Sequence, residues 1–474
     1  MKPLDWLLKI TGARETLDRL HIPPLTPPEL ERDREPETRT PLAGSWTVVG
    51  RPGGRLAGMA ARACARAGSG LVIPRGEDFS SYPSGPDEAG AGGMPRKREI
   101  AVETVDICVF DATGLSEPGE TGRVFSFFHN WVGKISCSGR VLILADCPDA
   151  EQDPARHAIT GILQGFVRSF AREIGPRGIT ANLVLVPETG AAQAFLEPLM
   201  RFLASRRSVF ITGQTWELSA DAPPAGPQRT VRALEDKVAL VTGAARGMGA
   251  GIAGCLHREG ARVVLVDRPE SREQLRAAAA GVDGMPLVAD VTWPRAGAFL
   301  REEVEKEFGK LDILVHNAGI HLDRNVADMT PEQWRSIIDV NLASAVRLTR
   351  GLEPLIPDGG RIVGIASIAG LGGVAGETGY SGSKAGLAGY LTALAGKLKS
   401  RGIAVIPLAV GYVNTSMTES LPRFHQEIGR RLTALQQGGE PDDIGNLVVF
   451  LAGPCGSALT GKTIRACGGM MLGA

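Results

Sequence analysis

Tyr380 and Lys384 stand four residues apart, and Ser367 precedes them by a short loop. Residues at positions i and i+4 of a helix lie on the same face, so we expect the ammonium of Lys384 beside the phenol of Tyr380. A neighbouring cation favours the phenolate, which predicts that the pKa of Tyr380 falls from about 10 toward working pH. Such a phenol can give or take a proton, and the Ser367 hydroxyl can hold the oxygen concerned.

A Tyr-x-x-x-Lys pair alone is a weak signal, because most such pairs lie on helix surfaces. A glycine-rich stretch upstream strengthens it: the apolar run 238–242 ends in Gly243, Gly247 and Gly249, and apolar residues at helical spacing follow. Glycines let the backbone approach a pyrophosphate, and a helix N-terminus supplies N–H donors. An ordinary glycine-rich turn is the alternative, since the spacing is G-x-x-x-G-x-G rather than the commoner G-x-G-x-x-G.

Further apolar runs end in small polar residues, as the strands of a nucleotide-binding sheet do. In chain order, the motifs are T-G-x-x-x-G-x-G at 242–249, Asp267, D-V at 290–291, N-A-G at 317–319, Asn341, Ser367 and Y-x-x-x-K at 380–384. This combination resembles the short-chain dehydrogenase/reductase family over roughly residues 234–474. The tail, at 429–432, 437–443 and 460–468, is most similar to 3-oxoacyl thioester reductases. The long N-terminal extension is similar to the high-molecular-weight branch of those reductases.

The resemblance implies a catalytic tetrad of Asn341, Ser367, Tyr380 and Lys384. Tyr380 would give its proton to the developing alkoxide, and Ser367 would orient the carbonyl oxygen. Lys384 would bind the nicotinamide ribose and lower the pKa of Tyr380, while Asn341 would hold a water that passes protons to Lys384. His316 stands where the family more often has Asn, and we expect it to be structural only. The resemblance therefore predicts general acid catalysis of a carbonyl reduction.

The resemblance also implies a set of cofactor-binding residues. They are Gly243, Arg246, Gly247, Met248, Gly249, Asp267, Asp290, Val291, Asn317, Ala318, Gly319, Tyr380, Lys384, Gly411, Val413 and Thr415. Asp267 follows the second expected strand, where a carboxylate binds the adenosine ribose and repels a 2′-phosphate. This favours NAD(H) over NADP(H), although Arg246 or Arg268 could neutralise such a phosphate. Asp267, Asp290 and Val291 could also be plain strand-end turn residues.

Composition restricts the class of protein. The 474 residues carry a formal net charge of +0, which suggests neither nucleic acid nor a membrane surface as a partner. Seven cysteines without a C-x-x-C motif argue against a disulfide framework or structural zinc, and we expect no metal. The N-terminus has charges where a signal peptide is apolar, and no apolar run reaches spanning length. We expect a cytoplasmic protein.

The first half of the chain is also predicted to be α/β. The Pro-rich segment 22–40 reads as extended, and strands are expected at 47–50, 107–110 and 141–144. The stretch 171–179 resembles 395–403, and 202–204 resembles 450–452. Aligned this way, Asp146, Arg156 and Thr160 replace Ser367, Tyr380 and Lys384. We predict two doubly wound Rossmann-like domains with mostly parallel sheets: a degenerate, non-catalytic, Rossmann- or flavodoxin-like copy at 1–228, and a catalytic NAD-binding ketoreductase domain at 229–474.

The predicted function is NADH-dependent reduction of 3-oxoacyl thioesters, carried on acyl carrier protein or coenzyme A, in fatty-acid metabolism. A dehydrogenase for another secondary alcohol, such as a steroid or polyol, is one alternative, and an interaction module in the N-terminal half is another. Residues 416–437 are expected to form a substrate lid in which Arg423, Arg430 and Arg431 meet phosphates or remain a solvated basic face. A homodimer is expected through the helices that carry Asn341 and Tyr380.

Overall fold

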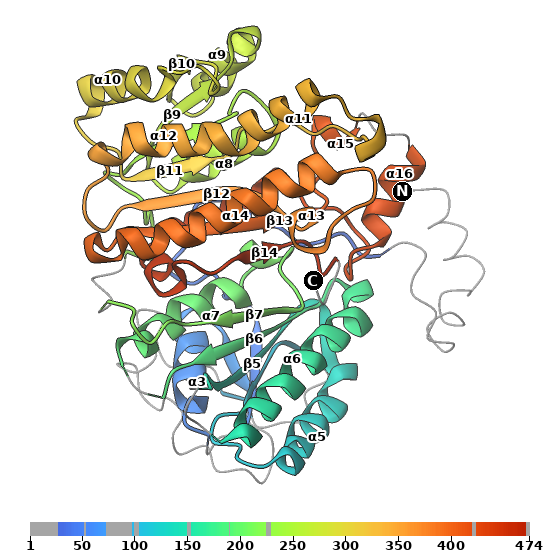
Figure 1. Cartoon of the computed structure of the whole chain (residues 1–474). Coiled ribbons are helices and arrows are strands. Elements are labelled where there is room, and N and C mark those ends of the chain that lie inside the picture. The colour runs from blue at the N-terminus through green and yellow to red at the C-terminus, as the bar shows by residue number, and fades with distance from the viewer. Residues whose placement is uncertain are drawn as a thin grey trace, which may run out of the picture.

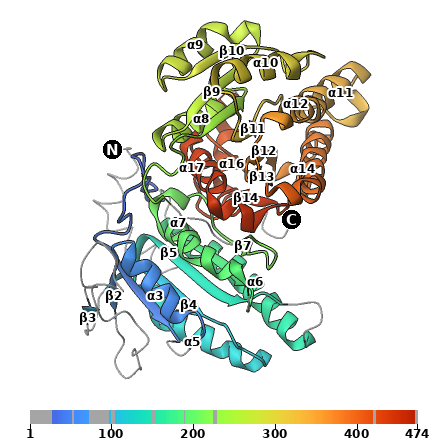
Figure 2. The ribbon, with the colours of Figure 1, turned by 90° about the vertical axis from the view of Figure 1, so that its left-hand side faces the viewer.

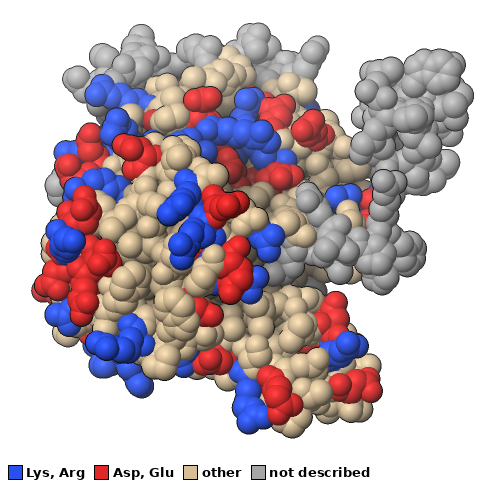
Figure 3. Space-filling view, turned by 90° about the horizontal axis from the view of Figure 1, so that it is seen from above, with Lys and Arg blue, Asp and Glu red and all other residues tan. Residues whose placement is uncertain are grey.

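Two parallel sheets of seven strands each organise the chain (Figure 1). They belong to a computed structural model that describes residues 27–51, 54–72, 97–98, 104–148, 153–188, 190–223, 229–419 and 423–470. The N-terminal sheet and its helices, blue to green, lie below the C-terminal sheet and its helices, yellow to red. On the face seen in Figure 3, acidic and basic side chains are interspersed, as the zero net charge suggests.

The N-terminal sheet has the strand order β3-β2-β1-β4-β5-β6-β7. Its strands are β1 (Trp46–Gly50), β2 (Gly70–Val72), β3 (Lys97–Arg98), β4 (Val105–Asp111), β5 (Ile135–Asp146), β6 (Thr180–Val186) and β7 (Gln214–Glu217). Helices α3 (Ala57–Arg66) and α7 (Leu196–Ala204) pack on one face, and α5 (Gly122–Trp131) and α6 (Pro154–Ile174) pack on the other. Because both faces are covered, the central strands are continuous apolar runs.

The C-terminal sheet has the order β10-β9-β8-β11-β12-β13-β14. Its strands are β8 (Val238–Thr242), β9 (Arg262–Asp267), β10 (Met285–Val288), β11 (Ile313–His316), β12 (Arg361–Ser367), β13 (Ala404–Val410) and β14 (Ile464–Ala466). One face carries α8 (Gly247–Arg258), α9 (Arg272–Ala280) and α17 (Pro441–Ala452). The other carries α10 (Ala296–Phe308), α12 (Ser344–Leu352) and α14 (Thr378–Leu398). The order reverses between β8 and β11, where doubly wound sheets bind ligands.

Counted from its own first strand, each sheet reads 3-2-1-4-5-6-7, so the predicted pair of Rossmann-like folds is confirmed. The halves also agree in detail. Nε of Arg140 donates to the Ser205 carbonyl at 3.1 Å, and Nε of Arg361 donates to the Gly453 carbonyl at 3.3 Å, at equivalent positions of β5 and β12. Burial lowers the pKa of both guanidinium groups to about 10. Such shared detail supports the interpretation of the first half as a degenerate copy.

The two halves share one continuous apolar core. Phe202 of α7 and Phe450 of α17, which occupy equivalent positions, stack with ring centroids 4.3 Å apart and an interplanar angle of 8°. Trp216 of β7 meets the same Phe450 edge-on, and Figure 2 shows α7 and β7 next to α17 and β14. One buried cluster includes residues from α3, α7, α8 and α17. The halves therefore pack against each other through α7 and β7 of one half and α17 of the other.

The described part of the Pro-rich segment, residues 27–40, contacts both halves. Arg32 forms an ion pair with buried Asp443 at 3.0 Å, and Glu37 accepts from Arg201 at 2.6 Å. The chain then passes from β7 to β8 through residues 218–237. The predicted boundary near 228 lies within 224–228, outside the described residues, and remains a prediction. In the part of the chain that the structure describes, no helix is both long and apolar enough to span a membrane.

Candidate active site

Three side chains of the predicted tetrad converge at the C-terminal ends of the central strands. Ser367 is the last residue of β12, and Tyr380 and Lys384 lie in the first turns of α14. A hydrogen bond joins the side chains of Ser367 and Tyr380, and Nζ of Lys384 lies 5.9 Å from the centroid of the Tyr380 ring. Ser367 Oγ also accepts from the Ala369 amide at 3.2 Å, which orients the hydroxyl. The structure thus brings phenol, hydroxyl and amine together.

The expected fall in the Tyr380 pKa does not occur. Burial raises the pKa of Tyr380 above its ordinary value, the hydrogen bond from Ser367 offsets part of the rise, and the Glu377 carboxylate adds to it. Desolvation of the phenol, which the spacing of Tyr380 and Lys384 along a helix does not show, is the largest cause. Lys384 is itself desolvated, and burial lowers its pKa to about 8. Its Nζ donates to the Ile365 carbonyl at 2.7 Å.

Asn341 completes the group from η8 (Asp339–Ala343), a single π-helical turn between α11 (Pro331–Ile338) and α12. Its Oδ1 accepts from the Ile320 amide at 2.8 Å, and its Nδ2 donates to the Ile320 carbonyl at 3.0 Å and to Ser383 Oγ at 2.9 Å. A Cβ on Gly319 would lie 3.2 Å from Asn341 Oδ1 and 3.3 Å from Lys384 Nζ. Asn341 and Lys384 therefore both lie beside Gly319, and Lys384 in turn lies beside the Tyr380 ring.

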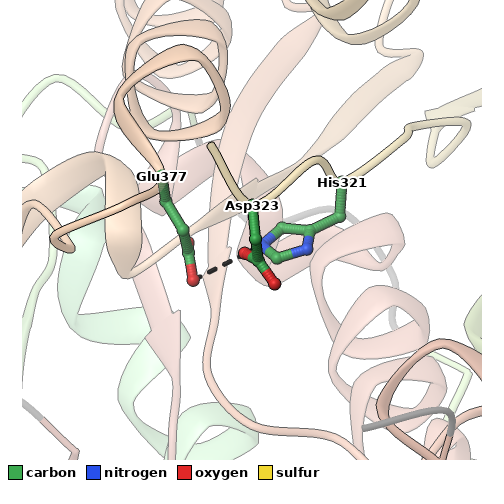
Figure 4. A group of neighbouring side chains, drawn as sticks. All are labelled: His321, Asp323 and Glu377. Atoms are coloured by element: carbon green, nitrogen blue, oxygen red, sulfur yellow. Dashed lines mark ion pairs between the residues drawn. The ribbon is translucent and has the colours of Figure 1, made fainter. Parts of the chain in front are cut away.

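Sequence reasoning missed a cluster beside Tyr380. The His321 ring meets the Tyr380 ring edge-on with centroids 4.5 Å apart. Nε2 of His321 lies 3.4 Å from carboxylate oxygens of both Asp323 and Glu377 (Figure 4). The Glu377 hydrogen bond raises the pKa of His321 above its ordinary value, although burial opposes the rise. One ligand atom from each of the three residues lies within 4.8 Å of the others, so the group could also hold a metal ion. The only sequence signal was a histidine two residues after the N-A-G motif.

The glycine-rich stretch forms a tight loop at the start of α8. Gly243 has φ +67° and Gly247 has φ +58°, a region that side chains avoid. A Cβ on Gly249 would lie 2.1 Å from the Gly243 carbonyl, so the loop closes on itself only with glycine there. Arg246 is exposed at the N-cap of α8 and makes no side-chain cap, while Met248 packs against the core. These features fit a loop that receives a pyrophosphate.

Asp267 ends β9 next to this loop. Its Oδ2 accepts from the Ala245 amide and its Oδ1 from the Arg268 amide, both at 2.9 Å. Asp290 instead holds its own turn, because its Oδ1 accepts from the amide and hydroxyl of Thr292 at 2.8 and 2.7 Å. Val291 beside it is buried. Asp267 therefore faces the loop, whereas Asp290 acts locally as a turn residue.

The turn Asn317-Ala318-Gly319 follows β11, on the other side of the switch point from the glycine-rich loop. We call this switch point between the loops after β8 and β11 the crevice. Nδ2 of Asn317 donates to the carbonyls of Thr242 and Gly243 at 2.9 and 3.0 Å. Its buried Oδ1 has no hydrogen-bond partner within the described structure. This acceptor and the glycine loop both fit a dinucleotide. His316, just before the turn, is buried against Thr349 Oγ1 at 2.8 Å, and burial lowers its pKa to about 4.

The loop after β13 supplies the last predicted cofactor residues. Gly411 donates to the Ala466 carbonyl at 3.0 Å, and a Cβ on it would meet Cys467 at 2.7 Å. Val413 is buried, and Thr415 contacts the glycine-rich loop, with its Cβ 3.7 Å from the Cβ position of Gly247. The crevice is thus bounded by the loops that follow β8, β11 and β13.

The predicted substrate segment 416–437 includes α15 (Ser416–Glu419) and α16 (Arg423–Arg431). Residues 420–422 and the Arg423 side chain lie outside the described structure. Arg430 and Arg431 each form an ion pair with Glu427 in their own helix, at 3.9 and 2.8 Å. These pairs favour the interpretation of a solvated helix face over a preformed phosphate site.

The equivalent crevice of the N-terminal half is closed by its own side chains. Arg51 takes the place of Gly243, with φ +56°, and its guanidinium donates to the carbonyls of Asp111 and Thr113. Asp111 takes the place of Asn317, and its Oδ2 accepts from the Leu56 amide at the start of α3 at 2.7 Å. A carboxylate therefore lies at the helix N-terminus where the other half is open.

The predicted loss of the tetrad in the N-terminal half holds at each aligned position. Asp146 ends β5 and pairs with Arg55 at 2.7 Å. Arg156, the third residue of α6, pairs with Glu188, and Thr160 Oγ1 donates to the Arg156 carbonyl at 3.2 Å. Two ion pairs and one hydrogen bond to the backbone thus stand where the C-terminal half has Ser367, Tyr380 and Lys384.

Comparisons with known proteins concern the C-terminal half. Residues 243–471 match the family model described as "Enoyl-(Acyl carrier protein) reductase". The 3-oxoacyl-[acyl-carrier-protein] reductase FabG of Escherichia coli K12 is 38% identical over 242 residues, which is 50% of this chain and 99% of that protein. The same enzyme of Thermotoga maritima is 35% identical over 244 residues, again 50% and 99%. A Burkholderia cenocepacia short-chain dehydrogenase solved in complex with NADP is 34% identical, with a TM-score of 0.48, over 50% of this chain and 98% of that one.

Proposed function

Because this chain belongs to the short-chain dehydrogenase/reductase family, we propose that its C-terminal half reduces the 3-keto group of an acyl thioester to a 3-hydroxyl group. The convergence of Ser367, Tyr380 and Lys384 beside the glycine-rich crevice carries the proposal. The identity to reductases of 3-oxoacyl-[acyl-carrier-protein] supports this choice of substrate. The thioester is carried by acyl carrier protein or coenzyme A, and the reaction belongs to fatty-acid metabolism.

A nicotinamide held by the loops after β8, β11 and β13 supplies the hydride when it is bound. The Ser367 hydroxyl donates to the substrate carbonyl and fixes its position. Tyr380 gives its phenolic proton to the same oxygen as negative charge develops there. The raised pKa of Tyr380 suits this direction, because the phenol keeps its proton near neutral pH. The Lys384 ammonium stabilises the phenolate left behind, and Asn341 supports a proton path to Lys384.

We propose NADH as the preferred donor. Asp267 supports it, because a carboxylate at the end of the second strand accepts hydrogen bonds from ribose hydroxyls and repels a 2′-phosphate. Arg246 and Arg268 lie close enough in sequence to weaken that repulsion, so the preference is a matter of degree.

We also propose a homodimer formed through α11, α12 and α14. Trp334 of α11 is 42% exposed, and it lies 4.0 Å from the Cβ position of Gly382 on α14. An exposed tryptophan beside small helix residues suits a helix–helix contact with a second copy.

The direct test is oxidation of NADH, followed at 340 nm, with acetoacetyl-CoA as the substrate. We expect turnover with acetoacetyl-CoA and faster turnover with NADH than with NADPH. The substrate assignment would be wrong if acetoacetyl-CoA and a 3-oxoacyl carrier protein both fail while a polyol or steroid is turned over in the presence of NAD.

A further inference from the structure

The segment between α16 and α17 lies directly against the N-terminal half. We call residues 433–439 the anchor segment. The Ala434 carbonyl packs on Gly175, at the end of α6, so closely that a Cβ on Gly175 would be 2.2 Å from that oxygen. The Gln437 side chain donates to the Pro28 carbonyl at 2.7 Å, and Nη2 of Arg32 reaches the Gly438 carbonyl at 3.4 Å. Pro28, Arg32 and Gly175, which are far from the anchor segment in sequence, therefore all contact it.

Phe210 is the central side chain of this contact. It is 1% exposed, and its ring lies 2.6 Å from the Cβ positions of both Gly439 and Gly468. The Phe210 carbonyl also accepts from the Gly468 amide at 2.9 Å, and Gly468 in turn accepts from the Ala434 amide at 2.8 Å. In the alignment of the two halves, Phe210 stands where the C-terminal half has Ala458. The bulky ring at this position is thus specific to the N-terminal half.

The other side of the anchor segment pairs with the loop that bounds the cofactor crevice. The Gly439 amide donates to the Tyr412 carbonyl at 3.0 Å, and the Asn414 amide donates to the Gly439 carbonyl at 2.8 Å. These two bonds bracket Val413 in a parallel bridge. The anchor segment therefore links the N-terminal half to residues 411–415 through a short series of backbone contacts.

We propose that the N-terminal half is a positioning domain that holds the anchor segment, and through it the 411–415 loop that bounds the crevice of the C-terminal half. The inference rests on the proposed function for what binds in the crevice. Loops without such packing sample open conformations at low cost in free energy. A catalytic geometry that is off by about 1 Å loses up to about 100-fold in rate. A degenerate copy that fixes one loop would therefore be useful without any chemistry of its own.

The most local test is a pair of glycine substitutions in the full-length chain. Gly175→Ala introduces a methyl group into the Ala434 carbonyl, so the anchor segment must shift. Gly165→Ala on the same helix meets nothing within 4 Å and serves as the matched control. We expect Gly175→Ala to raise the amide hydrogen-exchange rate of residues 411–415 and to weaken NADH binding, each by about tenfold. Gly165→Ala should leave both within about twofold of the wild type.

A second pair removes aromatic rings from the same interface between the halves. Phe210→Ala removes the ring that packs against the anchor segment. Phe202→Ala instead removes the ring that stacks on Phe450, away from that segment. Both variants should lose thermal stability. Only Phe210→Ala should increase the KM for acetoacetyl-CoA and the exchange of residues 411–415, with Phe210→Leu restoring part of the loss. Equal effects of both Ala variants on KM and exchange would show an interface that is only structural and would overturn the proposal.

The readouts separate this proposal from the proposed function. If the wild type does not reduce acetoacetyl-CoA, the substrate assignment fails, but exchange and NADH binding still test the positioning role. If Gly175→Ala and Phe210→Ala leave exchange at 411–415, the dissociation constant of NADH and KM at wild-type values while the chain stays folded, the positioning role is wrong and the substrate assignment stands.

Discussion

At the switch point of the C-terminal sheet, α8 begins with glycines, and the buried Oδ1 of Asn317 has no hydrogen-bond partner among the residues that the structure describes. At the switch point of the N-terminal sheet, the Asp111 carboxylate already lies at the N-terminus of α3, and the Arg51 side chain lies over the turn after β4. The topology is the same, but the C-terminal half has a glycine-rich loop at this point, whereas the N-terminal half has the carboxylate of Asp111. The comparison teaches that one strand order can surround either a glycine-rich loop or a buried carboxylate, because the side chains at the switch point do not determine the topology.

The largest expected effect is on proton transfer. Tyr380→Phe should lower kcat with acetoacetyl-CoA by about 1,000-fold, because the phenolic proton is lost, and the dissociation constant of NADH should change little. Arg156→Phe, at the equivalent position of α6, is the control from the other half and should keep kcat within about twofold. Comparable losses in both variants would show that the halves are not divided into catalytic and non-catalytic parts.

Asp111→Ala should destabilise the protein by about 3 kcal/mol, since buried donors lose a charged acceptor. The carboxylate accepts from the Leu56 amide at 2.7 Å and from the Thr113 amide and hydroxyl at 2.9 and 2.7 Å. Urea denaturation measures the change, and Asp111→Asn should lose less. Below the unfolding transition, kcat should stay within about twofold. An unchanged free energy of unfolding would contradict the view that Asp111 replaces a ligand.

His316 occupies the position that Phe110 has in the N-terminal half. Burial lowers its pKa to about 4, whereas in the unfolded chain it is about 6.5. As pH falls below 6.5, the unfolded chain binds a proton that the folded chain excludes, so stability decreases until about pH 4. His316→Phe should remove about 3 kcal/mol of this loss. Unfolding free energies of both proteins at pH 7, 5 and 4 measure it, and parallel pH curves would contradict the assignment.

The smallest expected effect concerns the cofactor, which only the open crevice should bind. Asp267→Ala should raise the ratio of NADPH to NADH use by about tenfold, or about 1.4 kcal/mol, because a carboxylate no longer repels the 2′-phosphate. Steady-state kcat/KM with each cofactor measures the ratio. Arg246→Ala is the opposing variant and should lower NADPH use. If the ratio does not rise in Asp267→Ala, the carboxylate does not decide the preference.

Much of the architecture follows from local sequence. Continuous apolar runs that end in small polar residues predict buried parallel strands, and the strand order of both sheets agrees with that. When residue 171 is aligned with residue 395, Arg156 and Thr160 match Tyr380 and Lys384. In the structure each pair occupies the third and seventh residues of its helix, α6 or α14. Spacing along one helix fixes which side chains share a face, so this part of the site could be read without coordinates.

Three features depended on contacts between distant segments. The Tyr380 pKa rises because the surrounding fold removes water from the phenol, which a neighbouring lysine in the sequence does not reveal. His321 meets Glu377 because the loop after β11 lies beside the start of α14.

The anchor segment meets Gly175 and Phe210 only when the two halves pack together. Local spacing along the chain thus determined the elements and the catalytic side chains. Desolvation and long-range packing depend on the whole fold. They decided the pKa values of the catalytic side chains and the contacts that hold the 411–415 loop.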